Sequence, residues 1–340
     1  MTAYQVNIVN SEKIFSVNPN EKILDAALRQ GVILAYGCKN GGCGTCKGKV
    51  HTGDYTSSDS LLNSGERSQG LALFCCTTAH SDLTIEAKVL EGVGDIHIKK
   101  IPCRIAELNK ISDDIMIVKL QLPATEKFVF LPGQYIDLLL KNNQRRSYSI
   151  ASNPLESILE LHIRHLEGGL FTDSLFGVSD IALKVRDILR FEGPLGTFFL
   201  RDSPKPIIML ASGTGFAPIK SIINDIKAKK INRKIKLYWG GRRPKDLYDL
   251  KQCQEWMDTM ENFSFIPVIS NAQLEDNWQG RDGFLHHAVM QDIPNMSAYE
   301  VYACGAPIMV ESAKKDFEEK CSLPDDAFFA DAFLSQADKT

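Results

Sequence analysis

Three cysteines share one glycine-rich loop near the start of this 340-residue chain. Cys38, Cys43 and Cys46 follow the spacing Cys-x4-Cys-x2-Cys, and Cys75 and Cys76 come downstream. With a fourth thiolate, this spacing predicts a [2Fe–2S] cluster, in which four thiolates converge on two irons. The intervening glycines let the backbone fold tightly and direct N–H groups at the sulfurs. A structural zinc site is the alternative, but its usual cysteine pairs and ligand sets differ.

A second candidate site lies on a predicted strand that contains Arg146, Ser147, Tyr148 and Ser149. Residues two apart on a strand face the same way. Arg146 and Tyr148 therefore share one face, which offers a cation for a phosphate and an aromatic plate for a ring. The strand alone is an ordinary barrel strand with a surface arginine. The interpretation as a binding site is strengthened by Gly168–Thr172, where glycines open a helix and can present N–H groups to a pyrophosphate.

A third candidate site lies in the last third of the chain. Met209–Pro218 contains a strand, the turn Gly213-Thr214-Gly215, and a helix with proline in its first turn. A glycine turn between a strand and a helix predicts a second phosphate-binding cradle. Cys304 and Gly305 follow another apolar strand, at the end where open α/β sheets bind ligands. A buried structural thiol is the alternative for Cys304.

The elements around these residues fall into three blocks. The first block, residues 1–92, shows two short strands, a helix at Glu21–Gln30 closed by Gly31, and a closing strand at Leu83–Ala87. Glu91–Asp95 indicates a linker, and we assign the connecting segment to residues 93–100.

The second block, residues 101–203, contains spaced strands with turn signals, which suggests an antiparallel barrel. Its predicted strands are Cys103–Glu107, Ile115–Leu122, Tyr135–Leu140, Ser147–Ala151, Ile158–Ile163 and Asp187–Phe191. The third block, residues 204–340, alternates buried strands with helices, which predicts a parallel α/β sheet.

Composition excludes several other classes of protein. The net charge of −3 argues against nucleic-acid binding, which needs a basic patch. No apolar run approaches the roughly 20 residues that span a bilayer, and the start has no signal-peptide pattern. Nine cysteines, an odd number in a long chain, do not resemble a secreted disulfide framework. We therefore expect a cytoplasmic protein with neither a membrane nor a nucleic-acid partner.

In this order, the three blocks resemble the ferredoxin–NADP reductase superfamily with a fused N-terminal plant-type ferredoxin. The resemblance covers essentially the whole chain. Its motifs here are the Arg-x-Tyr-Ser strand, the Gly-Thr-Gly turn, Pro132–Tyr135, Gly193–Gly196 and Cys304-Gly305. It implies an α+β multidomain fold: a β-grasp ferredoxin-like domain, an antiparallel Greek-key β-barrel that binds FAD, and an α/β parallel-sheet domain that binds the nicotinamide nucleotide.

The same resemblance implies roles for single residues around the flavin. Arg146 contacts the flavin pyrophosphate, Tyr148 packs on the isoalloxazine, and Ser149 hydrogen-bonds near N5. Gly169 and Thr172 also lie at the pyrophosphate.

Further roles concern the nicotinamide nucleotide and the tail of the chain. Cys304 lies beside the nicotinamide, and Phe333 is the terminal aromatic that covers the flavin. A core anchor is the alternative for Phe333. The nucleotide itself is contacted by Gly213, Thr214, Gly215 and Gly305.

The fourth cluster ligand depends on the resemblance to plant-type ferredoxins. These end with a Leu-x-Cys turn, a few small residues, Ser-Asp and a final strand. Aligning on Ser81-Asp82 and Leu83–Glu86 places the ligand at Cys75. The loop is then one residue shorter than in the commonest ferredoxins, so Cys76 stays an alternative.

The expected activity is electron transfer from a nicotinamide nucleotide through FAD and the cluster to a partner protein. NADH is the expected nucleotide and NADPH the alternative. The resemblance implies NADH, and Asp246 disfavours the 2′-phosphate that Arg242 and Arg243 could meet. The end of the chain and Gln144–Ala151 resemble reductases that serve the CDP-6-deoxyhexulose 3-dehydrase of dideoxysugar synthesis. The reductase component of a multicomponent mono- or dioxygenase is the alternative, and a non-enzymatic iron–sulfur sensor is a third hypothesis.

Overall fold

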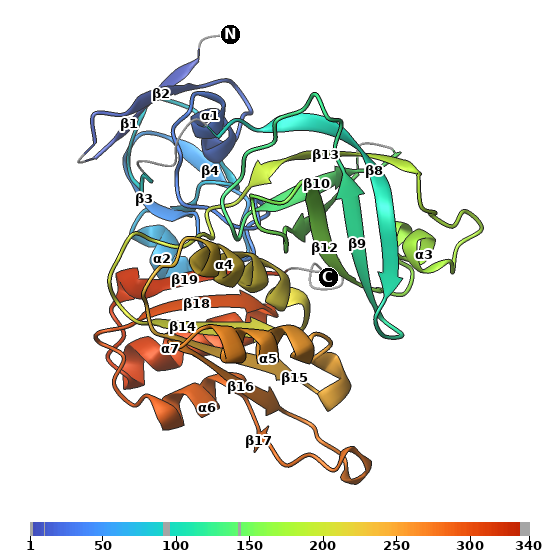
Figure 1. Ribbon diagram of the computed structural model, residues 1–340. Coiled ribbons are helices and arrows are strands. Elements are labelled where there is room, and N and C mark those ends of the chain that lie inside the picture. The colour runs from blue at the N-terminus through green and yellow to red at the C-terminus, as the bar shows by residue number, and fades with distance from the viewer. Residues whose placement is uncertain (1–2, 10, 91–95, 142–143, 334–340) are drawn as a thin grey trace. The chain divides into compact units, whose positions relative to one another are not determined.

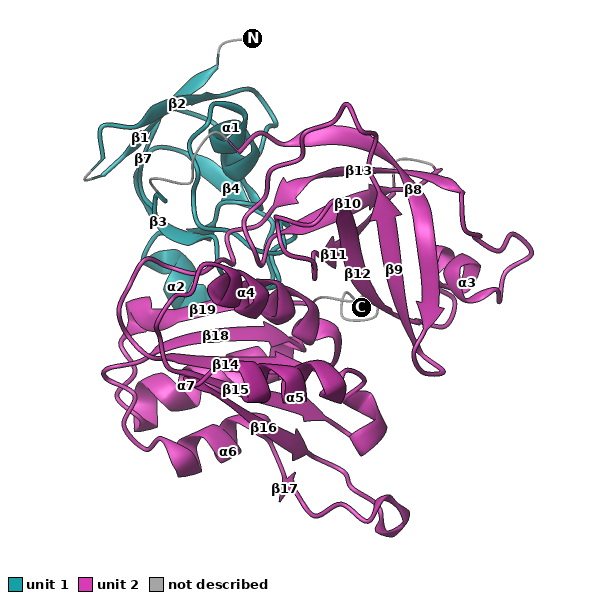
Figure 2. Ribbon diagram, in the orientation of Figure 1, with its two compact units in different colours: residues 1–95, 334–340 teal, residues 96–333 magenta. Residues whose placement is uncertain are grey.

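The computed structural model describes residues 3–9, 11–90, 96–141 and 144–333. They form two compact units, of which the first contains the described residues up to Leu90 and the second comprises Ile96–Phe333 (Figure 2). The linker expected at Glu91–Asp95 lies outside the described residues. Among the described residues, no helix is long and apolar enough to cross a membrane.

The first unit is built on a mixed five-stranded sheet in the order β2-β1-β7-β3-β5 (Figure 1). The central pair β1 and β7 is parallel, and the other pairs are antiparallel. The strands are β1 (Tyr4–Ile8), β2 (Ile14–Val17), β3 (Lys47–Thr52), β5 (Leu71–Leu73) and β7 (Leu83–Glu86). A separate ribbon pairs β4 (Tyr55–Ser57) with β6 (Thr77–Ala79), and the helices are α1 (Ile23–Arg29) and α2 (Ser64–Ser68).

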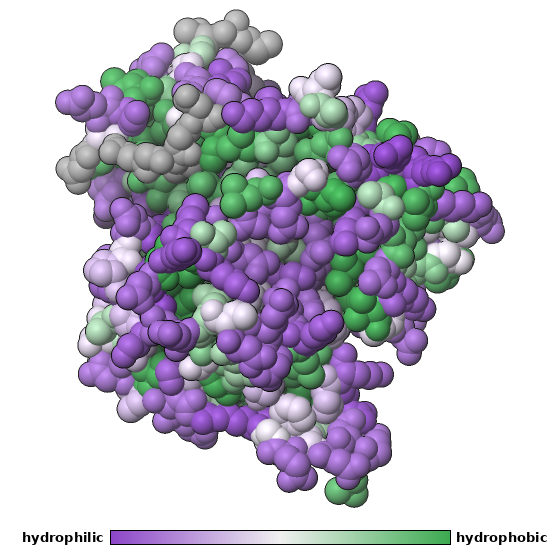
Figure 3. Space-filling view, in the orientation of Figure 1, coloured by the Kyte–Doolittle hydropathy of each residue, from purple (hydrophilic) through white to green (hydrophobic). Residues whose placement is uncertain are grey.

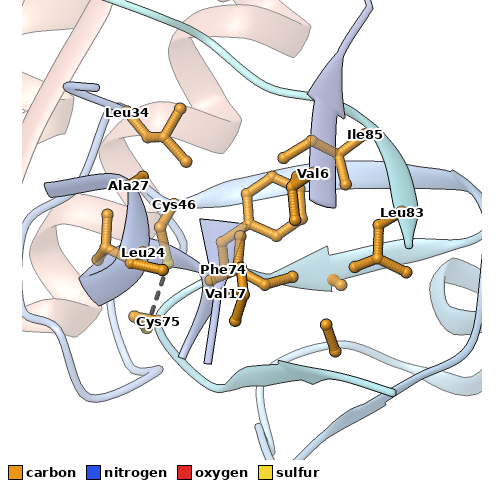
Figure 4. Close-up of a cluster of buried hydrophobic side chains, with 14 of the residues drawn as sticks. Val6, Val17, Leu24, Ala27, Leu34, Cys46, Phe74, Cys75, Leu83 and Ile85 are labelled. Carbon is orange, nitrogen blue, oxygen red and sulfur yellow. Dashed lines mark hydrogen bonds between the residues drawn. The ribbon is translucent and has the colours of Figure 1, made fainter. Parts of the chain in front are cut away.

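The core of the first unit forms where alternating strand residues meet α1. Val6 and Ile8 of β1 point inward, and Leu24 and Ala27 of α1 are fully buried against them. Figure 4 shows the same cluster extending to Cys46 and Cys75. The cysteine loop is therefore anchored at one end in a packed core.

The second unit begins with a six-stranded antiparallel sheet in the order β11-β10-β13-β8-β9-β12. A bridge between Ile150, just after β11, and Leu161 of β12 connects the two edges of this order. The elements are β8 (Lys99–Lys110), β9 (Ile115–Gln121), β10 (Tyr135–Leu139), β11 (Arg145–Ser149), β12 (Ile158–Arg164), α3 (Leu170–Phe176) and β13 (Ile188–Leu195).

A six-stranded parallel sheet completes the second unit, in the order β17-β16-β15-β14-β18-β19. The predicted parallel α/β sheet is confirmed, and β14 is buried almost throughout because helices cover both faces. The face seen in Figure 3 is largely hydrophilic over α4 and α5, as expected of covering helices. The elements are β14 (Ile207–Ser212), α4 (Phe216–Ala228), β15 (Ile235–Gly241), α5 (Leu250–Thr259), β16 (Phe263–Ile269), β17 (Arg281–Asp282), α6 (Leu285–Asp292), β18 (Glu300–Gly305), α7 (Pro307–Lys320) and β19 (Phe328–Ala332).

Several strand boundaries differ from the sequence prediction, among them the starts of β11 and β8. β11 begins two residues earlier than expected, because Arg145 pairs with Leu139 of β10. β8 begins at Lys99, inside the segment expected to be a linker, because Lys99 pairs with Gly193 of β13. Both extensions add exposed charged residues, which an apolar strand pattern does not reveal.

Candidate active site

The cysteine loop brings its sulfurs together in two pairs. The backbone N–H of Cys38 donates to Sγ of Cys43 at 3.4 Å, and Sγ of Cys46 lies 3.2 Å from Sγ of Cys75 (Figure 4). The positive φ of Gly41 and Gly44 allows the loop its tight course. Two pairs of thiols are the donor set that a two-iron core requires, two for each iron.

The ionisation of these thiols reflects their closeness. A hydrogen bond from the Cys43 thiol, together with backbone N–H groups, lowers the pKa of Cys38 to about 7. The pKa of Cys43 is raised correspondingly, and the hydrogen bond with Cys46 raises that of Cys75 to about 12. Such thiols lose their protons together when a metal binds, because only thiolates ligate iron. The residues present therefore fit an iron–sulfur core.

The structure places both candidates for the fourth ligand near the loop. Cys76 Sγ lies 3.6 Å from Cys75 Sγ and packs against Gly41, where an added Cβ would meet Cys76 Sγ at 2.7 Å. Only Cys75 has the contact with Cys46. The distances favour Cys75, and its assignment stays a prediction.

The flavin-type strand β11 alternates as its sequence predicts. On one face, Arg145 forms an ion pair with Glu192 at 2.8 Å, and the Ser147 hydroxyl donates to Asp137 at 2.6 Å. On the other face, the ring of Tyr148 lies 5.6 Å from that of Phe171 in α3. Arg146 and Arg145 are therefore on opposite faces of the strand.

The loop before α3 is held by a side chain that the sequence assigns to the pyrophosphate. The Thr172 hydroxyl donates to the carbonyl of Leu166 at 2.9 Å, and a Cβ on Gly169 would lie 2.3 Å from that hydroxyl. Gly169 is thus required by close packing at the start of α3. The predicted contacts of Gly169 and Thr172 with a pyrophosphate stay predictions.

The nucleotide-type turn and the Cys304-Gly305 segment interlock. A Cβ on Gly215 would lie 2.2 Å from the carbonyl oxygen of Cys304, and a Cβ on Gly305 would lie 2.6 Å from that of Ser212. Gly305 also has φ +134°, and Gly213 has φ +55°. Only glycines allow the ends of β14 and β18 to approach this closely. The structure thus brings together Gly213–Gly215, Cys304 and Gly305, as the sequence predicts.

The end of β19 and the residue after it contact the Cys304-Gly305 segment. The N–H of Phe333 donates to the carbonyl of Gly305 at 2.8 Å. Cys304 is fully buried, and its Sγ lies 4.0 Å from the Asp331 carboxylate on β19. Burial, reinforced by the Asp331 charge, raises the pKa of Cys304 far above the usual range of a thiol. Cys304 is therefore a neutral thiol at physiological pH.

Two charged residues near the turn Gly213–Gly215 and the end of β18 are absent from the sequence prediction. Asp331 is buried between Ala330 and Ala332 of β19, an acid in an otherwise apolar strand. Arg164 ends the apolar strand β12, and among the described residues its buried Nη2 has no hydrogen-bond partner. A Cβ on Gly213 would lie 3.6 Å from that nitrogen. A guanidinium N–H beside a glycine turn fits a phosphate group of a nucleotide.

A buried polar network connects β12 to the helices that follow the turn. His162 lies 2.8 Å from the Tyr248 hydroxyl through Nδ1 and 2.9 Å from Glu160 through Nε2. Lys220 of α4 donates to Glu160 at 2.9 Å and to Asp249 at 3.1 Å. These contacts fix α4, which begins directly after Gly215, against the antiparallel sheet.

An aromatic stack continues the network to the turn itself. Tyr248 packs edge-on against Trp239, whose indole N–H donates to the carbonyl of Gly213 at 3.1 Å. Phe216 stacks on Trp239 with ring centroids 3.9 Å apart. The glycine turn therefore rests on a rigid aromatic base.

Three family models match the chain in succession. Residues 6–80 match the 2Fe-2S iron-sulfur cluster binding domain, residues 102–200 the oxidoreductase FAD-binding domain, and residues 209–315 the oxidoreductase NAD-binding domain. The three cofactors expected from the motifs, a [2Fe–2S] cluster, FAD and a nicotinamide nucleotide, are thereby confirmed at the level of domains.

Full-length relatives agree with this order. The chain is 39% identical over 323 residues to the CDP-6-deoxy-L-threo-D-glycero-4-hexulose-3-dehydrase reductase of Yersinia pestis, covering 94% of this chain and 95% of the relative. It is 32% identical over 337 residues to terephthalate 1,2-dioxygenase reductase component 1 of Comamonas sp., covering 98% of both.

A solved structure leads to the same assignment. The cytochrome P450 reductase GcoB of Amycolatopsis superposes with a TM-score of 0.79 at 29% identity, covering 98% of this chain and 99% of that one. The chain thus belongs to the ferredoxin–NADP reductase superfamily, as an NAD(P)H-dependent iron–sulfur flavoprotein reductase with an N-terminal [2Fe–2S] domain.

Proposed function

We propose that this reductase oxidises NADH and delivers electrons one at a time to a CDP-6-deoxyhexulose 3-dehydrase. The observation that carries the choice of partner is the 39% identity, across all three domains, to a reductase named for that dehydrase. The terephthalate dioxygenase reductase component matches at 32% over 337 residues, and the phenol hydroxylase P5 protein of Acinetobacter pittii at 35% over 346 residues. An oxygenase component is therefore the second candidate partner.

The proposed roles of single residues follow the geometry of each site. Cys38, Cys43, Cys46 and Cys75 hold the cluster, and the hydrogen bonds between the thiols of Cys38 and Cys43 and between those of Cys46 and Cys75 support this. Cys304 lies beside the nicotinamide and Phe333 against the flavin, where the hydrogen bond from Phe333 to Gly305 supports their closeness. The nucleotide phosphates lie at the turn Gly213, Thr214 and Gly215, with Gly305 in contact with it.

The flavin roles rest on the strand β11 and the loop before α3. Arg146 binds the pyrophosphate, Tyr148 packs on the isoalloxazine, and Ser149 hydrogen-bonds near N5. Gly169 and Thr172 complete the pyrophosphate site. The alternation of Arg145 and Tyr148 across the strand supports this arrangement. When bound, FAD supplies the change from two-electron to one-electron transfer.

The finer features of the fold are part of the same proposal. The bridge between Ile150 and Leu161 supports a closed Greek-key barrel, and the mixed sheet with α1 supports a β-grasp first domain. We take the domains as residues 1–92, 101–203 and 204–340. The linker assigned to 93–100 ends before Lys99, where β8 begins. A cytoplasmic location suits cluster thiols that must stay reduced, and none of the nine cysteines forms a disulfide bond.

The partner is tested by comparing two electron acceptors in separate reactions. The purified reductase is mixed with NADH and either the dehydrase with its sugar substrate or an oxygenase component with its aromatic substrate. The proposal predicts partner-dependent product formation with the dehydrase at limiting reductase concentration. Product formation with the oxygenase alone would contradict it.

A further inference from the structure

The loops at the carboxyl ends of β15 and β16 meet beside the nucleotide turn. Ser212 of β14 is in register with Gly240 of β15, so the loop after Gly241 lies one strand away from Gly213–Gly215. The residue that follows the second strand of such a sheet meets the adenine ribose, through an acid for a free 2′-hydroxyl or an arginine for a 2′-phosphate. Arg242 and Arg243 occupy this position.

The Arg243 side chain is already bound by two carboxylates of the protein itself. Its guanidinium makes a bidentate contact with Asp276, through Nε at 2.5 Å and Nη2 at 2.8 Å, and Nη2 also donates to Glu275 at 2.9 Å. Both acids belong to the short helix η4 (Leu274–Asp276) in the connection between β16 and β17, which Figure 1 shows projecting past β16. Because β15 lies between β14 and β16, this partner holds Arg243 on the side away from the turn.

The position of this connection is itself fixed. The N–H of Ser270 donates to the carbonyl of Gly241 at 3.0 Å, and that of Asn271 donates to the carbonyl of Arg242 at 3.0 Å. The Asp276 carboxylate also accepts from the N–H of Gln273 at 2.9 Å. The hydrogen bond from Arg243 lowers the pKa of Asp276, so this carboxylate is charged throughout the physiological range.

Asp246, the acid that the sequence assigns to this position, has a different role. Its Oδ2 accepts from the backbone N–H of Arg242 at 2.8 Å and of Arg243 at 2.9 Å, so the carboxylate caps the turn. Its negative charge remains in the loop, but its oxygens are not the groups that hold the Arg243 side chain.

The charges around the ribose position cancel. Asp249 of the first loop is paired with Lys220 of α4. The two loops otherwise carry three positive and three negative side chains, namely Arg242, Arg243 and Lys245 with Asp246, Glu275 and Asp276. Among the described residues, the Arg242 guanidinium forms no ion pair. A neutral cluster attracts a phosphate dianion weakly, and neutralising both acids of η4 would give it a charge of +2.

We infer that Glu275 and Asp276 determine nucleotide specificity by withholding Arg243 from the 2′-phosphate, so that the reductase selects NADH. This rests on the proposed oxidation of NADH, and it names residues that act on the ribose through Arg243. They are specificity-determining residues and make no contact with the reacting atoms.

The test measures ferricyanide reduction by the full-length holoenzyme with NADH and with NADPH. The variant Glu275→Gln/Asp276→Asn keeps an acceptor for Gln273 and removes both charges. A charge-assisted arginine–phosphate contact, reduced by solvent screening, should lower KM for NADPH about five- to twentyfold. The kcat with NADPH and the KM for NADH should change less than about twofold, since a ribose contact is remote from hydride transfer.

Two further variants separate this mechanism from a general charge effect. Adding Arg243→Gln to the double variant should abolish the gain. The control Glu261→Gln/Glu319→Gln removes two exposed charges at the amino end of β16 and the end of α7, and it should leave both KM values unchanged. The gain should also shrink as ionic strength rises.

The outcomes distinguish this inference from the proposed function. If the unmodified protein reduces ferricyanide with neither nucleotide, the proposed function fails. If it oxidises NADH but the double variant leaves KM for NADPH unchanged, or the gain survives Arg243→Gln, only the specificity mechanism fails. A preference of the unmodified protein for NADPH also overturns it.

Discussion

Cys75 and Cys76 are adjacent cysteines whose thiols contact different residues. Cys75 lies 3.2 Å from Cys46, whereas Cys76 lies against Gly41. We predict that Cys75→Ser abolishes the visible absorption of the [2Fe–2S] cluster, because one iron loses a thiolate. Cys76→Ser should keep that absorption nearly intact. Loss of the cluster from the Cys76 variant alone would reverse the assignment.

Cys304 differs from a reactive cysteine in its protonation. Burial raises its pKa far above the normal range, so the thiol stays protonated from pH 6 to 9. We predict that Cys304→Ala slows flavin reduction by NADH, since small errors in donor–acceptor distance are costly. The pH profile of that rate should have the same shape in both proteins. Stopped-flow absorbance checks this, and an inflection present only in the wild type would show that the thiol titrates.

Arg146 and Arg145 form a matched pair on one strand. A charge-assisted contact with phosphate contributes about 1.5–3 kcal/mol, so Arg146→Ala should weaken flavin binding roughly ten- to a hundredfold. Arg145→Ala removes the surface ion pair with Glu192 and should cost no more than about 1 kcal/mol of stability. Fluorescence titration with FAD measures both, and equal losses of affinity would contradict the assignment of faces.

At the scale of elements, His162 connects β12 to the helices of the parallel sheet. Burial lowers its pKa, so the folded protein holds a neutral ring that donates to Glu160 and accepts from Tyr248. The stability from this neutral ring is fully present above the unfolded pKa of about 6.5 and is lost as pH falls below it. Burial alone would raise the pKa of Glu160, but His162 and Lys220 lower it to about 2, so Glu160 stays charged in this range.

We therefore predict a pH-dependent effect of His162→Gln. At pH 7.5 the variant should be less stable, since it lacks the ring and its contacts. Between pH 6.5 and 5 the difference in free energy of unfolding between wild type and variant should narrow by about 1 kcal/mol. Only the wild type has an imidazole here that is protonated in the unfolded state and neutral in the folded state. Urea unfolding followed by tryptophan fluorescence reports on this unit, which contains all three tryptophans. A gap that is constant with pH would show that His162 does not titrate on unfolding.

The elements show where sequence reasoning succeeds. Long apolar strands such as β14, and the glycine turn that follows it, have patterns that local chemistry dictates. The short strands β5 and β6 and the five-residue helix α2 were not predicted, because three to five residues carry too little periodicity. The conformation of β5 and β6 is set by pairing with β3 and β4, and α2 is held at its start by a capping box of Asn63 and Glu66.

The same limit applies to the site. Cysteine spacing and interlocking glycines can be read locally. The contact of Arg243 with Asp276 joins residues 33 positions apart, and that of Cys304 with Asp331 joins residues 27 apart. The register of β18 with β19 pairs Cys304 with Asp331, and the adjacent ends of β15 and β16 bring the loops of Arg243 and Asp276 together, so the sequence alone does not reveal these contacts.

At the scale of the whole molecule, one chain carries two kinds of redox site in separate compact units. The 2Fe-2S domain lies in the first unit, and the FAD-binding and NAD-binding domains lie in the second. A nicotinamide donates two electrons as hydride and a [2Fe–2S] core accepts one, so a flavin must stand between them. The central claim is that electrons reach the cluster only through the flavin.

The most direct test uses Arg146→Ala protein that has been freed of flavin and retains the visible absorption of its cluster. It is mixed anaerobically with NADH, frozen, and examined by electron paramagnetic resonance for the reduced [2Fe–2S] signal. The account predicts no signal without flavin and a full signal after saturating FAD is added. A reduced cluster in the flavin-free protein would contradict it.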